Sequence, residues 1–481
     1  MITRIEIDGF KSFKGFEMDF TPLTVIAGTN ASGKSNLFDA IQLLSRLAEV
    51  DLRTAFGEQR GDASELFLKY NDTTSANEMT FAVEMLVDRK VKDNWGQEAE
   101  LEYTRLRYEL KIERKVNEKG FESLFATYES LINLEQQDDE WTRIIDKENL
   151  EQWIPQKSIE QEDNLPYIAT GSDGDLPLAF TIPYDGKIGD KVKPLNSKDI
   201  VPYVEPGFAL TRLGTLYGAE QTVLSRFVTI DFKHILAARE EMRSWKVWQF
   251  NSENLREPTR IEINTNYTIS RSGKNLAAAL FRIKQDDEYS LIEISRTLNN
   301  FLPEFTEVNV EDDKANKQYI IKLTTEDGRV FSSRVLSEGT LRLLALCILL
   351  YDPQHKNLLC FEEPENGIHP YRIKAMIDVL KDLTTDFSDN SLSVRQVIVN
   401  THSPILINEM MNWENDKYVS VWFANMTTLI TDFEKRKHKI KITKIIPVSI
   451  DPQLVTSEFS EQEKKLSMIE VSRYLSTMKF E

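Results

Sequence analysis

Two glycines, a lysine and a serine near the start of the chain stand at the spacing of a phosphate-binding loop. The stretch Gly28-Thr29-Asn30-Ala31-Ser32-Gly33-Lys34-Ser35 fits the pattern G-x-x-x-x-G-K-[ST]. Small residues let successive backbone N–H groups turn toward phosphate oxygens, and a helix N-terminus favours negative charge. We predict that Lys34 reaches the β- and γ-phosphates of a nucleotide and that the Ser35 hydroxyl binds Mg²⁺.

Two adjacent glutamates end a second apolar segment. Glu362 and Glu363 follow Leu358–Phe361 in NLLCFEEPENGIHP. Beside a P-loop, ATP hydrolysis requires one carboxylate near Mg²⁺ and one aimed at the attacking water. Alternating strand side chains place the two on opposite faces, so we assign Glu362 to the metal and Glu363 to the general base. The alternative is a solvated acidic turn.

A histidine and a serine complete the set of candidate residues. The run QVIVNTHSPIL ends a third strand at His402, and strand ends of a parallel sheet bind ligands, so we predict that His402 contacts the γ-phosphate or the water. In LSEGTLRLLAL, Ser337 lies near the N-cap of a helix and forms a second anion site. Since the P-loop fills the first, we interpret the second as serving another copy of the protein. A structural histidine and a capped core helix are the alternatives.

Apolar elements flank the phosphate loop as this motif requires. LTVIAG precedes it as a strand, and Leu37, Ala40, Ile41, Leu44 and Leu47 follow at helical spacing. FAVEMLV, LEYTRLRYELKIER and RIEINTNYTI alternate like strands. No sustained heptad pattern appears, which argues against a long coiled coil.

Composition excludes several classes of protein. The chain has 481 residues, enough for about two to three domains, and a formal net charge of −18, which argues against a surface coated for non-specific nucleic-acid binding. Cys347 and Cys360 lie in apolar runs and are expected to be reduced core residues. The run LRLLALCILLY is too short to span a bilayer, and MITRIEIDGF reads as a strand rather than a signal peptide. We therefore expect a soluble cytoplasmic protein without membrane contact.

The order of these motifs resembles the ABC-type ATPases of the SMC, RecF and OLD group. Their layout is a P-loop, a long interruption, L-S-x-G, an acidic strand with E-E-P-E and a strand ending in T-H-S, and DGFKSFKG resembles their N-terminal strand pair. LSEGTLRLLAL, EEPENGIHP, QVIVNTHSPIL, REEMRSWKVWQF and GKNLAAAL resemble more closely the ATPase subunits of Septu-like and PARIS-like anti-phage systems.

The resemblance implies an α/β ATPase head with a mixed β-sheet that binds ATP and Mg²⁺ and forms a head-to-tail dimer or higher oligomer. Ser337 and Gly339 of one subunit would contact the γ-phosphate bound by Lys34 of the other. The expected nucleotide-binding residues are Gly28, Asn30, Ser32, Gly33, Lys34, Ser35, Asn36, Ser337 and Gly339; Ser35 and Glu362 bind the metal, and Glu363 and His402 are catalytic.

Three positions depart from the family pattern. Glu338 stands where a second glycine is common and Thr340 where a glutamine is common. A glutamate beside a γ-phosphate must point away, because like charges repel. Glu362 replaces the more common aspartate, which would slow turnover. Gln59, in GEQRGD, is a candidate for the family's Q-loop glutamine.

We divide the chain into four parts: an N-terminal half of the ATPase head (1–70), a β-rich remainder with an acidic insertion and helical lobe (71–330), a C-terminal half (331–410) and a C-terminal extension (411–481). We interpret the acidic segment 136–190 as a surface insertion. In the extension, EKRKHKIKITK alternates Ile440 and Ile442 with lysines and predicts an edge strand with a solvated basic face. The alternative is a nucleic-acid patch that includes Lys435, Arg436, Lys437 and Lys439.

Two classes of function agree with these features. The first is an ATP-hydrolysing sensor of an anti-phage complex that controls a separate effector nuclease, since residues 403–481 contain no DxD pattern for a nuclease of its own. The second is an ATP-stabilised scaffold that sequesters and releases a toxic effector with little turnover. A RecF-like DNA repair ATPase is a third interpretation, weakened by the missing coiled coil and the negative charge.

Overall fold

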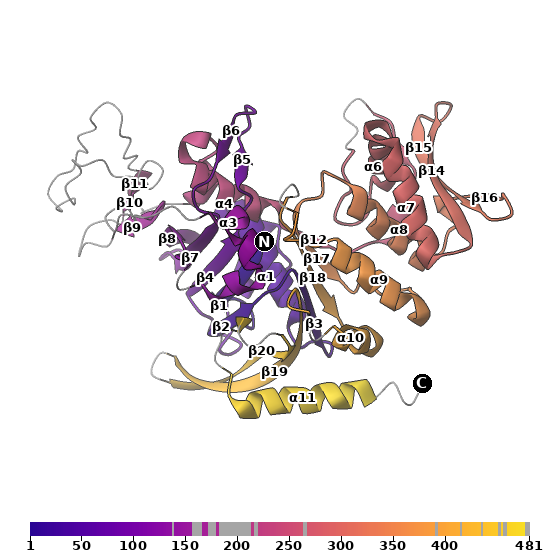
Figure 1. Ribbon diagram of the computed structural model, residues 1–481. Coiled ribbons are helices and arrows are strands. Elements are labelled where there is room, and N and C mark those ends of the chain that lie inside the picture. The colour runs from indigo at the N-terminus through magenta and orange to yellow at the C-terminus, as the bar shows by residue number, and fades with distance from the viewer. Residues whose placement is uncertain are drawn as a thin grey trace.

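The centre of the molecule is a six-stranded sheet in the order β12-β17-β18-β3-β19-β20 (Figure 1). The structure is a computed structural model that describes residues 1–136, 139–155, 166–171, 179–181, 213–215, 220–262, 267–389, 393–413, 416–433, 436–450, 454–455 and 459–476. The strands are β12 (Lys246–Trp248), β17 (Asn357–Glu362), β18 (Arg395–Thr401), β3 (Leu23–Gly28), β19 (Val419–Phe433) and β20 (Arg436–Ser449). All neighbouring pairs are parallel except β19 and β20, so the predicted α/β class with a mixed sheet is confirmed.

Both faces of the central sheet are buried at β3 and β18. On β18, Ile398 enters one core cluster while Val397 and Val399 enter the other. Parallel strands covered on both faces are continuous apolar runs, which explains why this segment shows no polar alternation. Cys347 and Cys360 are buried free thiols, as predicted, and burial raises the pKa of both.

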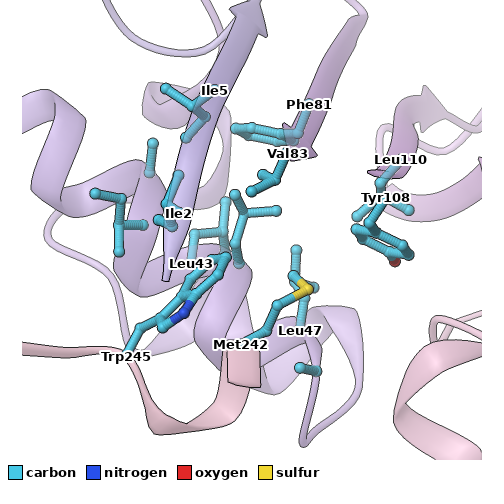
Figure 2. Packing of buried hydrophobic residues seen from close by; sticks show 14 of the residues in the cluster. Ile2, Ile5, Leu43, Leu47, Phe81, Val83, Tyr108, Leu110, Met242 and Trp245 are labelled. Carbon is cyan, nitrogen blue, oxygen red and sulfur yellow. The ribbon is translucent and has the colours of Figure 1, made fainter. Parts of the chain in front are cut away.

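A five-stranded antiparallel sheet, in the order β2-β1-β4-β7-β8, contributes to the first cluster. Its strands are β2 (Phe16–Asp19), β1 (Ile2–Asp8), β4 (Glu78–Leu86), β7 (Arg105–Val116) and β8 (Glu122–Asn133). Figure 2 shows Ile2, Val83, Leu43 and Trp245 packed together, with Leu43 from helix α1 (Lys34–Leu47) and Trp245 just after α4 (Lys233–Ser244). The strands predicted in FAVEMLV and LEYTRLRYELKIER therefore exist.

A second lobe contributes to the other cluster and is seen at the right of Figure 1. Its sheet has β13 (Thr259–Arg260), β15 (Gln318–Thr325) and β14 (Phe305–Asp313), and β16 (Val330–Ser332) pairs with β15. The helices of this half are α5 (Ser252–Arg256), α6 (Leu276–Asp286), α7 (Glu288–Phe301), α8 (Glu338–Tyr351), α9 (Pro370–Asp382) and α10 (Pro404–Met411). Of the strand predicted in RIEINTNYTI, only Arg260 lies in a strand; Ile261 and Glu262 do not, and residues 263–266 lie outside the described residues.

The C-terminal segment completes the central sheet rather than standing apart from it. β19 is hydrogen-bonded to β3, and β20 is the sheet's edge strand, as predicted, with Ile440 and Ile442 buried. Helix α11 (Glu461–Ser476) runs along this hairpin (Figure 1). Lys435 lies outside the described residues. The division into four parts stays a prediction.

The remaining elements are short. They are α2 (Leu52–Gly57), α3 (Lys147–Trp153), the pair β5 (Lys90–Lys92) and β6 (Glu98–Glu100), and the sheet of β9 (Ala169–Gly171), β10 (Ala179–Thr181) and β11 (Leu213–Thr215). Within the predicted insertion 136–190, residues 139–155 bury Trp141 and Trp153 against Phe387, and most of the rest lies outside the described residues. Among the described helices, none has the length and apolar character that a bilayer span requires, and none forms a long coiled coil.

Leu43→Ala should destabilise the fold by about 2–5 kcal/mol, because a fully buried leucine is replaced by a cavity between the N-terminal strands and Trp245. Chemical denaturation measures this as a lower midpoint. Ile292→Ala is the matched control, since that side chain is 51% exposed on α7 and its loss should change stability by less than about 0.5 kcal/mol. An equal shift in both variants would contradict this packing.

Candidate functional site

The predicted phosphate loop joins β3 to α1 in a conformation suited to anions. Gly28, Ala31 and Gly33 have positive φ angles of 153°, 61° and 91°. Left-handed residues alternating with others turn backbone N–H groups to one side of a loop. Gly33 is the N-cap of α1 and no side chain caps this helix, so its first N–H groups are left for a ligand.

The hairpin of β19 and β20 packs against the phosphate loop. A Cβ at Gly33 would lie 1.8 Å from the Thr443 hydroxyl oxygen of β20, so only glycine fits. The Thr443 hydroxyl is 2.6 Å from the hydroxyl of Ser12, and the Asn36 amide donates to the same Ser12 oxygen at 2.7 Å. Asn36, predicted to bind nucleotide, is thus tied to the DGFKSFKG loop.

The ammonium of Lys34 lies within the loop. It donates to the carbonyl oxygens of Gly28 at 2.8 Å and Thr29 at 2.9 Å, and the Ser32 hydroxyl is 3.5 Å away. Burial lowers the pKa of Lys34, and the carboxylates of Glu363 and Glu365 oppose this shift. A phosphate at the loop must replace the two carbonyls as acceptor. Asn30, at the exposed tip, makes no hydrogen bond with the described residues.

The oxygen atoms beside the loop fit Mg²⁺. Glu362 ends β17 opposite Asn400 of β18, and the Asn400 amide nitrogen is 3.5 Å from the Ser35 hydroxyl. Glu362 Oε1 and Asn400 Oδ1 are buried and accept no hydrogen bond from the described residues. Mg²⁺ prefers oxygen ligands and usually takes one or two carboxylates, with phosphates and waters completing its octahedron. Ser35, Glu362 and Asn400 are the residues that would hold it.

Glu363 and His402, both predicted to be catalytic, lie in contact. His402 Nδ1 lies 2.6 Å from Glu363 Oε1, and the Asn366 amide donates to Glu363 Oε2 at 2.7 Å. When Nδ1 is the donor to the Glu363 carboxylate, Nε2 is the ring atom left to face water or phosphate. Glu363 has a φ of 48°, and such strain in a non-glycine residue gathers at functional sites.

Ser337 is the N-cap of α8, as predicted, and its oxygen accepts from the Thr340 N–H at 3.2 Å. Gly339 is buried, and a Cβ there would lie 2.3 Å from the carbonyl oxygen of Gly367. Glu338 accepts from Arg342 one turn later at 2.8 Å, which agrees with the expectation that its carboxylate turns aside. Among the described residues, no hydrogen bond or ion pair joins residues 28–36 to residues 337–340.

Besides Asn400, three residues near the site were not predicted. Arg60 donates to Asp39 at 3.1 Å and lies 3.9 Å from Glu362 Oε1, whereas the Gln59 amide donates to the Ala55 carbonyl of α2 at 3.5 Å. Arg60 directly follows Gln59, whose Q-loop role stays a prediction. The other two, Glu365 and Tyr474, lie around His402; Glu365 is the third acid of EEPE, but no sequence signal marks Tyr474.

Two sequence families match the chain. One, described as "AAA domain, putative AbiEii toxin, Type IV TA system", matches residues 214–408, and the other, described as "AAA domain", matches residues 4–185. Each of these two parts of the chain is therefore similar to an AAA domain. The second match includes the phosphate loop, and the first includes α8, Glu363 and His402. No curated protein matches the chain.

Solved structures with a similar chain trace include SMC head domains. The SmcHead bound to the C-winged helix domain of ScpA is 13% identical at a TM-score of 0.45, with 92% of this chain and 98% of that chain covered. The SMC head domain from Thermotoga maritima is 12% identical at 0.36, covering 93% and 99%. The Smc head from Pyrococcus furiosus, bound to the C-terminal domain of ScpA, is 12% identical at 0.40, covering 98% and 99%. These scores are low, so the fold class rests on the sheet order and the phosphate loop.

Gly339→Ala should lower ATP hydrolysis strongly while nucleotide binding at the P-loop persists. The added methyl group meets the Gly367 carbonyl and must displace the start of α8, at a cost of about 1–3 kcal/mol. Phosphate release and titration with a fluorescent ATP analogue measure the two effects. Gly57→Ala is the control, because no atom lies within 4 Å of its Cβ position. Unchanged hydrolysis in Gly339→Ala would contradict the close approach.

Proposed function

We propose that this chain is an ATP-hydrolysing sensor and regulator subunit of a bacterial anti-phage defence complex, in which ATP-gated dimerisation controls a separate effector nuclease. One observation carries the ATPase part. Lys34, Ser35, Glu362, Glu363 and His402 meet at the end of β3, β17 and β18, with the base and the histidine in contact. Their chemistry matches binding of MgATP and activation of water.

Dimerisation follows from the arrangement of the second anion site. Ser337 is exposed at the start of α8 and makes no contact with the phosphate loop of its own chain among the described residues. A second copy, placed head to tail, supplies the missing contact on the γ-phosphate. Each site is then complete only when both subunits and ATP are present, so hydrolysis reports assembly.

The effector part of the proposal draws on the family match. One matching family is described as a putative toxin of a type IV toxin–antitoxin system, which supports a role in a toxin–antitoxin or defence system. The Septu-like and PARIS-like resemblance of EEPENGIHP and QVIVNTHSPIL points the same way. The nuclease itself belongs to another chain in this proposal.

A scaffold that holds an effector with little turnover is the second candidate. It is favoured by the ammonium of Lys34, which donates to the loop carbonyls of Gly28 and Thr29. ATP must replace these carbonyls as acceptors when it binds, which favours slow turnover.

The solution mass with and without ATP and Mg²⁺, recorded together with phosphate release, distinguishes the sensor from the scaffold. ATP-dependent assembly with steady release supports the sensor, and ATP-independent assembly without release supports the scaffold.

Glu363→Gln should retain ATP binding and trap an engaged dimer, because the phosphate and metal contacts remain while the base is lost. Lys34→Ala should lose nucleotide binding itself, since its charge faces the phosphates. Light scattering with ATP and Mg²⁺, paired with phosphate release, measures both. If Glu363→Gln hydrolysed ATP like the parent, the assignment of the base would be wrong.

A nucleic-acid trigger is the proposed use of the basic edge strand. Lys437 and Lys439 are exposed on β20 and form no ion pair with the described residues. Arg436 is also exposed at the start of this strand. Lysines on an edge strand also block strand-to-strand association, so direct binding must decide between the two uses.

Replacing Lys437 and Lys439 with glutamine should weaken binding of a labelled duplex and reduce the slope of log K against log salt by about 1.8, since each phosphate contact contributes about 0.9. Fluorescence anisotropy across a salt series measures this slope. Glutamine at Lys119 and Lys314, which are exposed elsewhere, is the charge-matched control. Equal slopes in the two double variants would exclude the strand as the binding surface.

A further inference from the structure

His402 is held mainly by hydrogen bonds rather than by packing. Its side chain is 42% exposed, and its imidazole touches Glu363. The chain on either side is fixed: Thr401 ends β18 fully buried, and Ser403 caps α10 by accepting from the Leu406 N–H at 3.3 Å. Because the His402 imidazole has few packing contacts, its orientation depends on how firmly the backbone of residues 401–403 is held.

Glu365 pins the backbone on the N-terminal side. The Thr401 hydroxyl accepts from the Ser403 N–H at 2.9 Å and donates its own hydrogen to Glu365 Oε1. Glu365 is only 6% exposed, and its other oxygen accepts no hydrogen bond from the described residues. A half-satisfied buried carboxyl is costly, and an apolar residue would serve stability better. We explain this loss of stability by a role of the Glu365 carboxyl in fixing the turn at residues 401–403, which carries His402.

Tyr474 pins the backbone on the other side. Its hydroxyl, from α11, donates to the carbonyl oxygen of His402. The ring packs edge to face on Phe423 of β19, with centroids 6.1 Å apart, and Phe423 pairs in register with Ala27 of the P-loop strand. Val471, one turn earlier on α11, is buried in the same core cluster as Phe423. Burial raises the pKa of Tyr474 to about 12, so the hydroxyl remains a donor at neutral pH.

We propose that Tyr474 and Glu365 are positioning residues for His402, and that α11 is therefore a working part of the ATPase site. This inference rests on the proposed ATPase function. The two residues act through the backbone of residues 401–403 and do not meet the nucleotide. They fix the direction in which the imidazole leaves the chain, and hence the atom that it offers to water or phosphate.

The first test compares Tyr474→Phe with the parent in steady-state ATP hydrolysis. Loss of one hydrogen bond should lower kcat about 2- to 12-fold and leave KM for ATP unchanged, because Lys34 and the phosphate loop are untouched. Tyr289→Phe is the matched control, since that ring is 61% exposed on α7. An unchanged kcat in Tyr474→Phe, or an equal loss in Tyr289→Phe, overturns the proposal.

A double-mutant cycle with His402→Ala tests whether Tyr474 acts through the histidine. Once His402 is absent there is no imidazole to position, so Tyr474→Phe should cause no further loss of kcat. Losses that multiply in the double variant would show that Tyr474 acts elsewhere and would overturn the proposal.

Two substitutions of Glu365 separate positioning from proton transfer. Glutamine keeps an oxygen that accepts from Thr401, so Glu365→Gln should regain most of the kcat that Glu365→Ala loses. If glutamine were as damaging as alanine, the carboxyl would act by its charge and the positioning role would be wrong. Thermal midpoints check folding, and the Tyr474 cycle decides the question should Glu365→Ala fail to fold.

Failure of the proposed ATPase function is distinguishable from failure of this inference. A parent chain without hydrolysis would refute the first, and the second would then be followed by the NMR chemical shifts of the His402 ring protons at one fixed pH, assigned with His402→Gln. Tyr474→Phe and Glu365→Ala should both change these chemical shifts, because each alters the turn that carries the ring, and Tyr289→Phe should not. Unchanged signals in Tyr474→Phe and Glu365→Ala would overturn the positioning role by itself.

Discussion

The site depends on the hydrogen-bonded register of three parallel strands. β18 lies between β3 and β17, with Asn400 beside Ile26 on one side and beside Glu362 on the other. In a parallel sheet all strands point the same way, so everything that follows their last residues gathers at one edge. Residues far apart along the chain, Ser35, Glu362 and His402 among them, thereby become neighbours. A slip of one residue in the pairing of β17 with β18 would turn Glu362 to the other face of the sheet.

Burial on both faces of these strands limits which polar groups can stand at their carboxyl ends. The strands can be apolar along most of their length. The polar side chains at their carboxyl ends are partly removed from water, so each of their oxygen atoms needs a hydrogen-bond partner or a cation. Thr401 finds Glu365, and Glu363 finds His402 and Asn366, whereas Glu362 Oε1 and Asn400 Oδ1 accept no hydrogen bond from the described residues. Oxygens that accept no hydrogen bond beside a phosphate loop are suitable ligands for a cation. The left-handed backbone of Glu363 is a second cost concentrated at this place.

Local chemistry could be predicted from the sequence, and long-range pairing could not. The phosphate loop, the cap at Ser337 and the acids after β17 depend on neighbours within a few residues, and the structure places them as expected. The pairing of Glu338 with Arg342 is also local, at the i,i+4 spacing of a helix. Alternation in RIEINTNYTI indicated a strand, but strand length depends on the partner strand, and β15 pairs with only Arg260 among the described residues of this stretch. Thr443 and Tyr474 gave no signal, because their roles come from contacts with residues far away in the sequence.

The C-terminal segment shows why such contacts matter for mechanism. β19 lies against the P-loop strand and brings β20 with it, so that Thr443 excludes any side chain at Gly33. The same strand carries Phe423, against which Tyr474 packs before reaching His402. One hairpin and one helix thus touch both the loop that receives phosphate and the turn that presents the histidine. A displacement of the whole segment would reach both places, whereas the hydrogen bond from the Tyr474 hydroxyl acts on the turn at His402.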